Sequence, residues 1–345
     1  MINVGVVGCG SIARKRHATE YLANLDVNIL GFNDHYNERA DYMTKEFGGK
    51  VYDSVDEMFA DPSIDAVSIC AANAFHADLT IKALNSGKHV LCEKPMAITL
   101  KDCEDMVAAA HKNNKQLMIG HNQRLSLAHI KAKQILDSGE LGRVISFSTT
   151  FGHQGPEMWG IDKSADTWFF KKSSAAFGSM ADLGIHKIDL LIYLISGHVT
   201  KVYADLTTLD KKFTDGTMIE VDDNSVSILT FDNGTIGTVT TSWTYYGEES
   251  NATILYCEKG IIRLYANPTY SLEIIYSDNT KVHYELDKIQ TNVDDIQTSS
   301  GVIDMFIDGV VRDEKTVLDG AIALESMKVV FACLKSSEEG RPIIM

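Results

Sequence analysis

Residues 2–13 read Ile-Asn-Val-Gly-Val-Val-Gly-Cys-Gly-Ser-Ile-Ala, and this stretch decides the fold of the first part of the chain. The apolar, β-branched run Ile2–Val7 is typical of a buried strand. It leads directly into Gly8, Gly10 and Ala13, which fit the pattern Gly-x-Gly-x-x-Ala. The first glycine allows a tight turn, the second lets a pyrophosphate approach the backbone, and the alanine lets a helix pack closely. The stretch therefore predicts a strand, a phosphate-binding turn and a helix; the alternative is a purely structural glycine turn.

The segment after this turn alternates between strand-like and helical patterns. Further short apolar runs predict strands at Val27–Phe32, Ala66–Cys70, His89–Cys92 and Gln116–Ile119. Helical spacing of apolar residues predicts helices at Ile12–Leu22, Ala77–Asn85 and Leu100–Asn113. Continuous apolar strands separated by helices indicate a doubly wound parallel sheet of the Rossmann type, covered on both faces. Residues 1–120 are therefore predicted to form a dinucleotide-binding domain.

The rhythm changes after residue 120. The predicted elements there are a helix at Leu127–Leu136, a strand at Arg143–Phe151, an irregular segment at Gly152–Phe177, a helix at Ser179–Ile195, strands from Val199 to Glu285, and helices at Val302–Arg312 and Leu318–Ser336. Two turn signals, Asp232 to Gly234 and Glu258 to Gly260, predict hairpins. Residues 121–345 are thus predicted to form an α+β domain on an open, mostly antiparallel sheet, for substrate binding and oligomerisation. The last helix is expected either to stay with this domain or to pack back on the first.

Composition limits the classes of protein that fit. The chain has 345 residues, 32 Lys+Arg and 47 Asp+Glu, giving a net charge of −15. Such an acidic chain repels nucleic acid and anionic membranes. The absence of a signal peptide and of an apolar run of about 20 residues predicts a cytoplasmic protein. None of the six cysteines forms a Cys-x-x-Cys pair, so buried thiols are expected, and no spacing predicts a metal site.

The end of the second predicted strand bears on the choice of cofactor. Asp34 follows this strand directly, and an acidic side chain there can accept a hydrogen bond from a ribose 2′-OH while repelling a 2′-phosphate. This pattern favours NAD over NADP. The alternative is that Asp34 caps the helix expected near Asn37, and the nearby Arg39 leaves NADP open as the less favoured cofactor.

Three further motifs follow strands or open helices. They are Glu93-Lys94-Pro95, Asn73-x-x-His76, and Gly178-x-x-x-Asp182-x-Gly184-x-His186-x-x-Asp189. Together with the glycine turn, in this order, they make the chain resemble the Gfo/Idh/MocA oxidoreductases, the family of glucose–fructose oxidoreductase and inositol dehydrogenase. The resemblance implies hydride transfer between a nicotinamide cofactor and a secondary hydroxyl of a sugar, sugar derivative or inositol. It also implies a homodimer or homotetramer.

The resemblance implies a role for each matching residue. Lys94 is similar to the family lysine that contacts both the nicotinamide ribose and the substrate hydroxyl, and Asp182 and His186 are similar to its partners in proton transfer. The predicted cofactor-binding residues are Gly8, Gly10, Ser11, Ile12, Asp34, Ala71, Asn73, His76, Glu93, Lys94 and Asn122. The predicted substrate-binding residues are Lys94, Arg124, His153, Trp168, Asp182 and His186.

The chemistry of alcohol oxidation asks for these residue types. An ammonium group such as that of Lys94 can stabilise a developing alkoxide, and an imidazole can take a proton near neutral pH. Asp182 and His186 are four residues apart on a predicted helix and so share a face. The alternatives are a surface lysine and a helix whose Asp and His are only structural. Asp189 is expected to be structural, and Trp168 is equally compatible with core packing.

The chain departs from the family pattern in three places. Ala176 and Phe177 replace two glycines before Gly178, Ala71 and Ala72 replace Thr-Pro, and His121 replaces Phe. A side chain as large as that of Phe177 is expected to narrow or reshape its loop. Two other functions stay open: a non-catalytic NAD-binding regulatory protein, and an NAD-dependent glycoside hydrolase of the same broad family.

Overall fold

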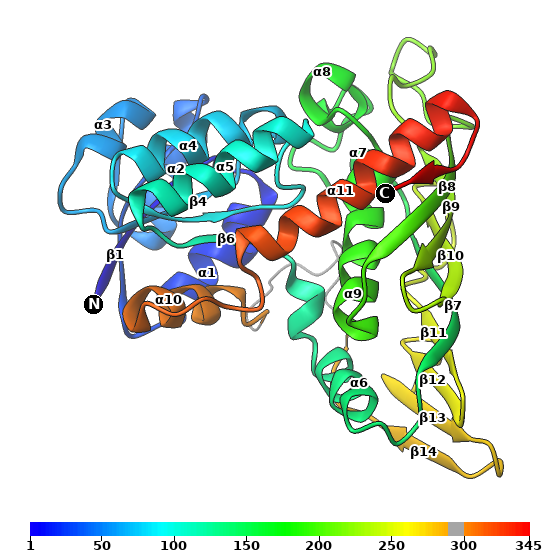
Figure 1. The fold of residues 1–345 in the computed structure, drawn as a ribbon. Coiled ribbons are helices and arrows are strands. Elements are labelled where there is room, and N and C mark those ends of the chain that lie inside the picture. The colour runs from blue at the N-terminus through cyan, green and yellow to red at the C-terminus, as the bar shows by residue number, and fades with distance from the viewer. Residues whose placement is uncertain (289–299) are drawn as a thin grey trace. The chain divides into compact units, whose positions relative to one another are not determined.

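The computed structural model describes residues 1–288 and 300–345, which fall into two compact units (Figure 1). The first unit holds residues 1–122 and 300–325, and the second holds residues 123–288 and 326–345. Helix α11 (Gly320–Glu339) contributes residues to both units. Within the described residues, none of the helices is both long enough and apolar enough to cross a bilayer.

The first unit is built on a parallel sheet. Its described strands are β1 (Ile2–Val7), β2 (Val27–Asn33), β3 (Lys50–Val51), β4 (Ala66–Ile69), β5 (His89–Cys92) and β6 (Leu117–Ile119), in the order β3-β2-β1-β4-β5-β6. Every pair in this sheet is parallel. The order reverses direction between β1 and β4, so the carboxyl ends of these two strands flank the position where such sheets bind ligands. The predicted Rossmann fold is confirmed.

Helices of the first unit lie close to their predicted positions. They are the π-helical turn η1 (Ala13–Ala18), α1 (Thr19–Ala23), α2 (Asn37–Phe47), α3 (Val55–Ala60), the 3-10 turn η2 (Asn73–Phe75), α4 (His76–Asn85), α5 (Leu100–Asn113) and α10 (Val302–Arg312). Ser54 and Thr99 accept the backbone N–H groups of Glu57 and Asp102, which caps α3 and α5. The first helix is not the regular α-helix that the sequence predicts, because it passes through a π turn.

The second unit carries a mixed sheet. Its described strands are β7 (Val144–Gly152), β8 (Val199–Thr207), β9 (Asn224–Phe231), β10 (Ile236–Ser242), β11 (Thr253–Cys257), β12 (Gly260–Leu264), β13 (Leu272–Tyr276), β14 (Lys281–Tyr284) and β15 (Ile343–Ile344). Their order is β14-β13-β12-β11-β7-β10-β9-β8-β15. Only β10 and β7 pair in parallel among these strands, and both predicted hairpins are present, as β9–β10 and β11–β12. The predicted mostly antiparallel sheet is confirmed.

Helices cover one face of this sheet. Those of the second unit are α6 (Leu127–Asp137), α7 (Pro156–Trp159), α8 (Lys172–Ala175) and α9 (Ile185–Ile195), with the turns η4 (Trp168–Phe170) and η5 (Met180–Gly184); the turn η3 (Asn122–Leu125) precedes them. Figure 1 shows α6 and α9 along the same face. The predicted irregular segment 152–177 therefore contains three short helical elements. Beside η5, a buried cluster forms from Phe151, Phe170, Leu183, Ile219, Val221 and Trp243.

Candidate active site

The glycine turn after β1 has the shape that a dinucleotide phosphate requires. Gly8 has φ +86°, and a Cβ at this position would lie 2.7 Å from the backbone nitrogen of Ala71. Any other residue would therefore be strained and would clash. A Cβ at Gly10 would meet nothing within 4 Å, so the backbone is open at the start of the helix. Open backbone beside a helix N-terminus fits a pyrophosphate.

Asp34 braces this turn. Its Oδ2 accepts the backbone N–H of Cys9 at 2.7 Å, and its Oδ1 accepts the N–H of Tyr36, the N-cap of α2, at 2.8 Å. The guanidinium of Arg39 lies over the Tyr36 ring, 4.6 Å from its centroid. These contacts agree with the alternative interpretation of Asp34, as a residue that orders the start of α2. Binding of the ribose by Asp34 stays a prediction.

Glu93, at the end of β5, is the centre of a buried charge network. Its Oε1 lies 2.9 Å from His17 Nε2 and 3.5 Å from Arg16 Nη1, and its Oε2 accepts the backbone N–H of Lys94 at 3.2 Å. The residue is only 5% exposed. Burial by itself raises the pKa of Glu93, but the hydrogen bond from His17 and the charges of Arg16, His17 and Lys94 lower it to about 2. A fixed negative charge therefore lies beneath the backbone of Lys94.

His76 joins two loops at the same edge of the sheet. Its Nδ1 lies 2.8 Å from the carbonyl oxygen of Pro95, and its Nε2 lies 3.0 Å from that of Ala71. The ring is buried, and burial lowers the pKa of His76. The loops after β4 and β5 are thus held together by this imidazole. Its contacts are those of a positioning residue, while direct contact with a cofactor stays a prediction.

The first unit brings most of its predicted residues to one edge. The glycine turn, Asn73 and Lys94 follow β1, β4 and β5, which are parallel neighbours. Lys94 is half-buried, Asn73 is buried, and Asn122 opens the turn η3. This is the edge at which open parallel sheets bind ligands.

In the second unit, Asp182 lies on the π-helical turn η5 and His186 follows on α9. The two residues lie one turn apart on this helix, and both are buried. The indole Nε1–H of Trp243 donates to Asp182 Oδ2 at 3.0 Å. The His186 ring packs against Phe151, with 6.0 Å between centroids. π turns occur frequently at functional sites.

The loop before Asp182 is held by another carboxylate. Asp222 Oδ1 accepts the N–H of Gly178, and its Oδ2 accepts the N–H of Met180 and the hydroxyl of Ser179, at 2.7 to 2.8 Å. A Cβ at Gly178 would lie 1.9 Å from the carbonyl oxygen of Asp222, so this position requires glycine. Burial raises the pKa of Asp222. The loop before Asp182 is therefore held by a residue 44 positions after Gly178, in the strand-rich part of the chain.

The two residues that replace family glycines behave differently. Ala176 has φ +68° and ψ −47°, a conformation that side-chain-bearing residues rarely adopt. Phe177 is buried, and its ring packs edge-on against Phe331 of α11 at 5.7 Å between centroids. The bulk of Phe177 is thus accommodated by packing inside the second unit.

Arg124 and Asp189 form a buried bidentate ion pair. Nε lies 2.6 Å from Oδ2, and Nη2 lies 2.7 Å from Oδ1. Ser326 also donates to Asp189 Oδ1, at 2.7 Å. These contacts fit the structural role expected for Asp189. The same contacts give Arg124 a structural role. Substrate binding by Arg124 stays a prediction.

The two remaining predicted substrate residues belong to a row of aromatic rings. The buried His153 ring lies edge-on to Phe151 and to Trp159, at 5.6 and 6.1 Å between centroids. Trp168 is partly exposed and stacks on Phe169 at 3.8 Å. Both interpretations of Trp168, as part of the pocket wall and as a packing residue, stay predictions.

Sequence reasoning missed the partners of the site residues: Arg16, His17, Asp222 and Trp243. Arg16 and His17 follow the glycine turn on its helix, and two polar residues facing the sheet could have indicated a buried network. Asp222 and Trp243 carry no local signal, because their partners are 44 and 61 residues away in the sequence.

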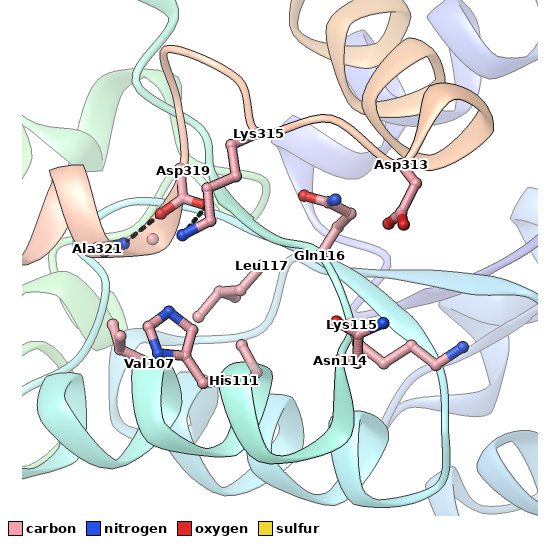
Figure 2. A pocket seen from close by; sticks show the side chains of 12 residues that line it. Val107, His111, Asn114, Lys115, Gln116, Leu117, Asp313, Lys315, Asp319 and Ala321 are labelled. Atoms are coloured by element: carbon pink, nitrogen blue, oxygen red, sulfur yellow. Dashed lines mark hydrogen bonds and ion pairs between the residues drawn. The ribbon is translucent and has the colours of Figure 1, made fainter.

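A small pocket of about 90 Å³ lies elsewhere in the first unit (Figure 2). Its ionisable lining residues are His111 and Lys115 near the end of α5 together with Asp313, Lys315 and Asp319. It sits at the start of β6, the opposite edge of the sheet from the glycine turn. It is also far smaller than the roughly 300 Å³ or more of typical ligand sites, so it is not the cofactor site. Among the described residues, no group of three or more His, Cys, Asp or Glu gathers as metal ligands.

A Rossmann sheet with an open glycine turn, joined to a second unit on a mixed sheet, defines a class of dinucleotide-binding oxidoreductases. Residues 2–121 match a family model described as an oxidoreductase family with an NAD-binding Rossmann fold. Residues 129–263 match the GFO/IDH/MocA C-terminal domain. The chain belongs to the Gfo/Idh/MocA family, as its motifs predicted.

Three similar proteins illustrate the family. The chain is 32% identical over 226 residues to a glucose-6-phosphate 3-dehydrogenase of Bacillus subtilis (strain 168), in an alignment that covers 65% of this chain and 62% of that enzyme. It is 25% identical over 352 residues to a myo-inositol 2-dehydrogenase of Thermotoga maritima, covering 99% and 98% of the two chains. A levoglucosan dehydrogenase in complex with NADH and levoglucosan shares the fold, with a TM-score of 0.86, 23% identity, and coverage of 100% and 99%.

Proposed function

We propose that this protein is an NAD-dependent dehydrogenase that oxidises a secondary hydroxyl of a sugar, sugar derivative or inositol. The observation that carries the proposal is the position of Lys94, at the same sheet edge as the open glycine turn, in a chain of this family. The similar proteins named above act, by their names, on a sugar phosphate, an anhydrosugar and an inositol. Their names support the substrate class and leave the particular substrate open.

Each proposed role follows from the chemistry of a side chain. Gly8, Gly10, Ser11 and Ile12 would hold the pyrophosphate through backbone N–H groups, and Asp34 would bind the ribose. A bound nicotinamide supplies the hydride acceptor. The Lys94 ammonium stabilises negative charge on the substrate oxygen.

Residues of the second unit are proposed to accept the proton of the substrate hydroxyl. His186 takes it, and the carboxylate of Asp182 orients the imidazole and favours its protonated form. These roles require Lys94 and His186 to converge on one carbinol carbon. That convergence is a prediction.

The test is a screen for NADH formation, followed by absorbance, with glucose 6-phosphate, levoglucosan and myo-inositol, each with NAD and with NADP. We expect turnover with NAD on at least one compound. Lys94→Ala and His186→Ala should each lower kcat by at least about 100-fold, the usual contribution of such groups. The exposed Lys101 and His198 provide matched controls, Lys101→Ala and His198→Ala, which should leave turnover unchanged.

The competing functions give different results in this screen. A regulatory NAD-binding protein would bind NAD and oxidise none of the compounds. A glycoside hydrolase would release a reducing sugar without accumulating NADH. Near wild-type turnover by Lys94→Ala or His186→Ala would contradict the assigned roles.

The outer face of the second unit's sheet supports a homodimer or homotetramer as part of the proposal. Exposed apolar side chains gather there on neighbouring strands: Ile145, Tyr203, Val226, Ile228, Ile236 and Tyr256. A contiguous apolar face is typical of an interface. Ile228→Glu should therefore yield a smaller species in sedimentation velocity, while unchanged sedimentation would contradict the interface. All six cysteines lie within the described residues and are free and buried, which supports a reducing, cytoplasmic location.

A further inference from the structure

Trp243 is a buried indole that contacts the proposed proton-transfer machinery. It follows β10 directly, and its side chain is 0% exposed. Its ring packs against Phe170, 5.8 Å between centroids, in the apolar cluster beside η5. Within this cluster, Nε1–H donates to Asp182 Oδ2 at 3.0 Å. A phenylalanine would fill most of the same space without that hydrogen bond, so the N–H group is the distinguishing feature.

The chemistry of the indole makes this contact one-directional. An indole N–H can donate a hydrogen bond but cannot accept one. It therefore favours the ionised carboxylate of Asp182 over the neutral acid. Asp182 is 5% exposed, and burial by itself disfavours a charge. The hydrogen bond offsets part of that cost and fixes the position of Oδ2.

One short segment sets the position of both partners. The carboxylate of Asp222 accepts the N–H groups of Gly178 and Met180, which fixes the loop leading into Asp182. The backbone carbonyl of the next residue, Asp223, accepts the N–H of Trp243 at 2.8 Å. The loop before the acceptor, Asp182, and the backbone of the donor, Trp243, are therefore held by two consecutive residues, Asp222 and Asp223. The distance between donor and acceptor thus does not depend on a flexible loop.

We propose that Trp243 is a positioning residue, which holds Asp182 ionised and oriented so that Asp182 can act on His186. This inference rests on the proposed dehydrogenase function. It goes beyond it by assigning a role to a residue outside the family motifs of this chain. Trp243 acts through Asp182 and does not contact the reacting atoms.

The test is Trp243→Phe, which removes the N–H group and keeps an aromatic ring. We expect kcat to fall about 10- to 100-fold, as for loss of a hydrogen bond to a charged group, with KM for NAD unchanged. The kcat pH profile should move, because the ionised form of Asp182 loses its donor and acts differently on His186. Phe170→Leu is the matched control: it weakens the same cluster without touching that hydrogen bond, so the pH profile should stay in place.

A second measurement needs neither substrate nor cofactor. The chain has three tryptophans, so ¹⁵N labelling gives few indole N–H resonances, and the one that remains when Trp159→Phe and Trp168→Phe are combined belongs to Trp243. Asp182→Asn removes the charged acceptor and should shift this resonance while leaving those of Trp159 and Trp168 in place. An unshifted Trp243 resonance would overturn the proposal even if Trp243→Phe fails to fold. An unchanged pH profile and kcat in folded Trp243→Phe would overturn it as well. If the wild type shows no turnover while the Trp243 resonance shifts, the proposed dehydrogenase function is overturned and the hydrogen bond from Trp243 to Asp182 is retained.

Discussion

Two of the proposed catalytic residues have a buried ionisable neighbour in the chain: Glu93 precedes Lys94, and Lys187 follows His186. The two neighbours, Glu93 and Lys187, differ in how far nearby groups compensate the cost of burying their charge. Glu93 is compensated by the guanidinium of Arg16 and by its contact with the imidazole of His17. The contrast between these two regions shows where the fold fixes a charge and where it does not.

Lys187 lacks comparable compensation. Its Nζ donates to the carbonyl of Asn251 at 2.9 Å and to the hydroxyl of Thr253 at 3.3 Å, and it lies 5.6 Å from the centroid of the Phe151 ring. Burial lowers the pKa of Lys187 to about 7, although the charge of Glu249 acts in the opposite direction. The amine beside His186 thus loses its charge near neutral pH, whereas the carboxylate beside Lys94 keeps its charge down to strongly acidic pH.

The largest effect is expected on the compensated side. Glu93→Gln removes the buried carboxylate that lies 2.9 Å from His17 and 3.5 Å from Arg16, so the free energy of unfolding should fall by about 3 kcal/mol. The pKa of Glu93 is lower in the folded chain than in the unfolded one, so its contribution is present above about pH 4.5 and is lost as pH falls toward about 2. Urea unfolding from pH 7 to pH 3 should show the wild-type advantage shrinking. The exposed Glu57 gives the control Glu57→Gln, expected to change stability by less than about 1 kcal/mol; a similar loss in both variants would erase the contrast.

The uncompensated side should respond to pH in a different range, and its stability should also rise with pH there. Because the pKa of Lys187 is lowered to about 7, the unfolded chain binds one proton more than the folded chain between about pH 7 and 10. Relative to Lys187→Met, the wild type should therefore gain about 1.4 kcal/mol of stability per pH unit in that range. Chemical denaturation at pH 7.5 and 9.5 measures this difference. Lys201, an exposed residue on β8, gives the control Lys201→Met, and a pH-independent difference for Lys187→Met would show that the amine is charged in the fold.

The smallest expected effect concerns backbone strain. Near the first site a glycine, Gly8, takes the positive φ, whereas in the loop before Asp182 the residue with φ +68° is Ala176. Ala176→Gly should raise the free energy of unfolding by about 0.5–1 kcal/mol by relieving that conformation. The neighbouring Ala175, in the helix α8, supplies the control, since Ala175→Gly should lower stability by about 1 kcal/mol. Equal losses in both variants would mean that Ala176 is not strained.

The same contrast explains how far the sequence could lead. The bounds of β1, β5, α5 and α10 coincide with the predicted ranges, because each element has a regular apolar pattern and clear ends. The fold class and the family could therefore be predicted. The π turns at η1 and η5 could not, because nothing in the residue pattern distinguishes them from regular helix.

The sequence predicted the candidate site residues but not the residues that hydrogen-bond to them and hold them in place. Motif spacing selects Lys94, Asp182 and His186, but the contacts that hold them join distant parts of the chain. His17 meets Glu93 across 76 residues, and Trp243 meets Asp182 across 61. Such pairs depend on sheet order and register, which local patterns do not encode. Arg124 shows the reverse case, since its sequence position indicates a ligand contact while its guanidinium lies in an ion pair with Asp189.

The central claim is hydride transfer from a carbinol carbon, and isotope labelling tests it most directly. The substrate found in the screen is prepared with deuterium on the carbon that bears the oxidised hydroxyl and is incubated with the enzyme and NAD. We expect the deuterium on the nicotinamide ring of the product NADH, a slower rate than with unlabelled substrate, and loss of the transfer in Lys94→Ala. Deuterium released into water, or transfer that persists in Lys94→Ala, would contradict this account.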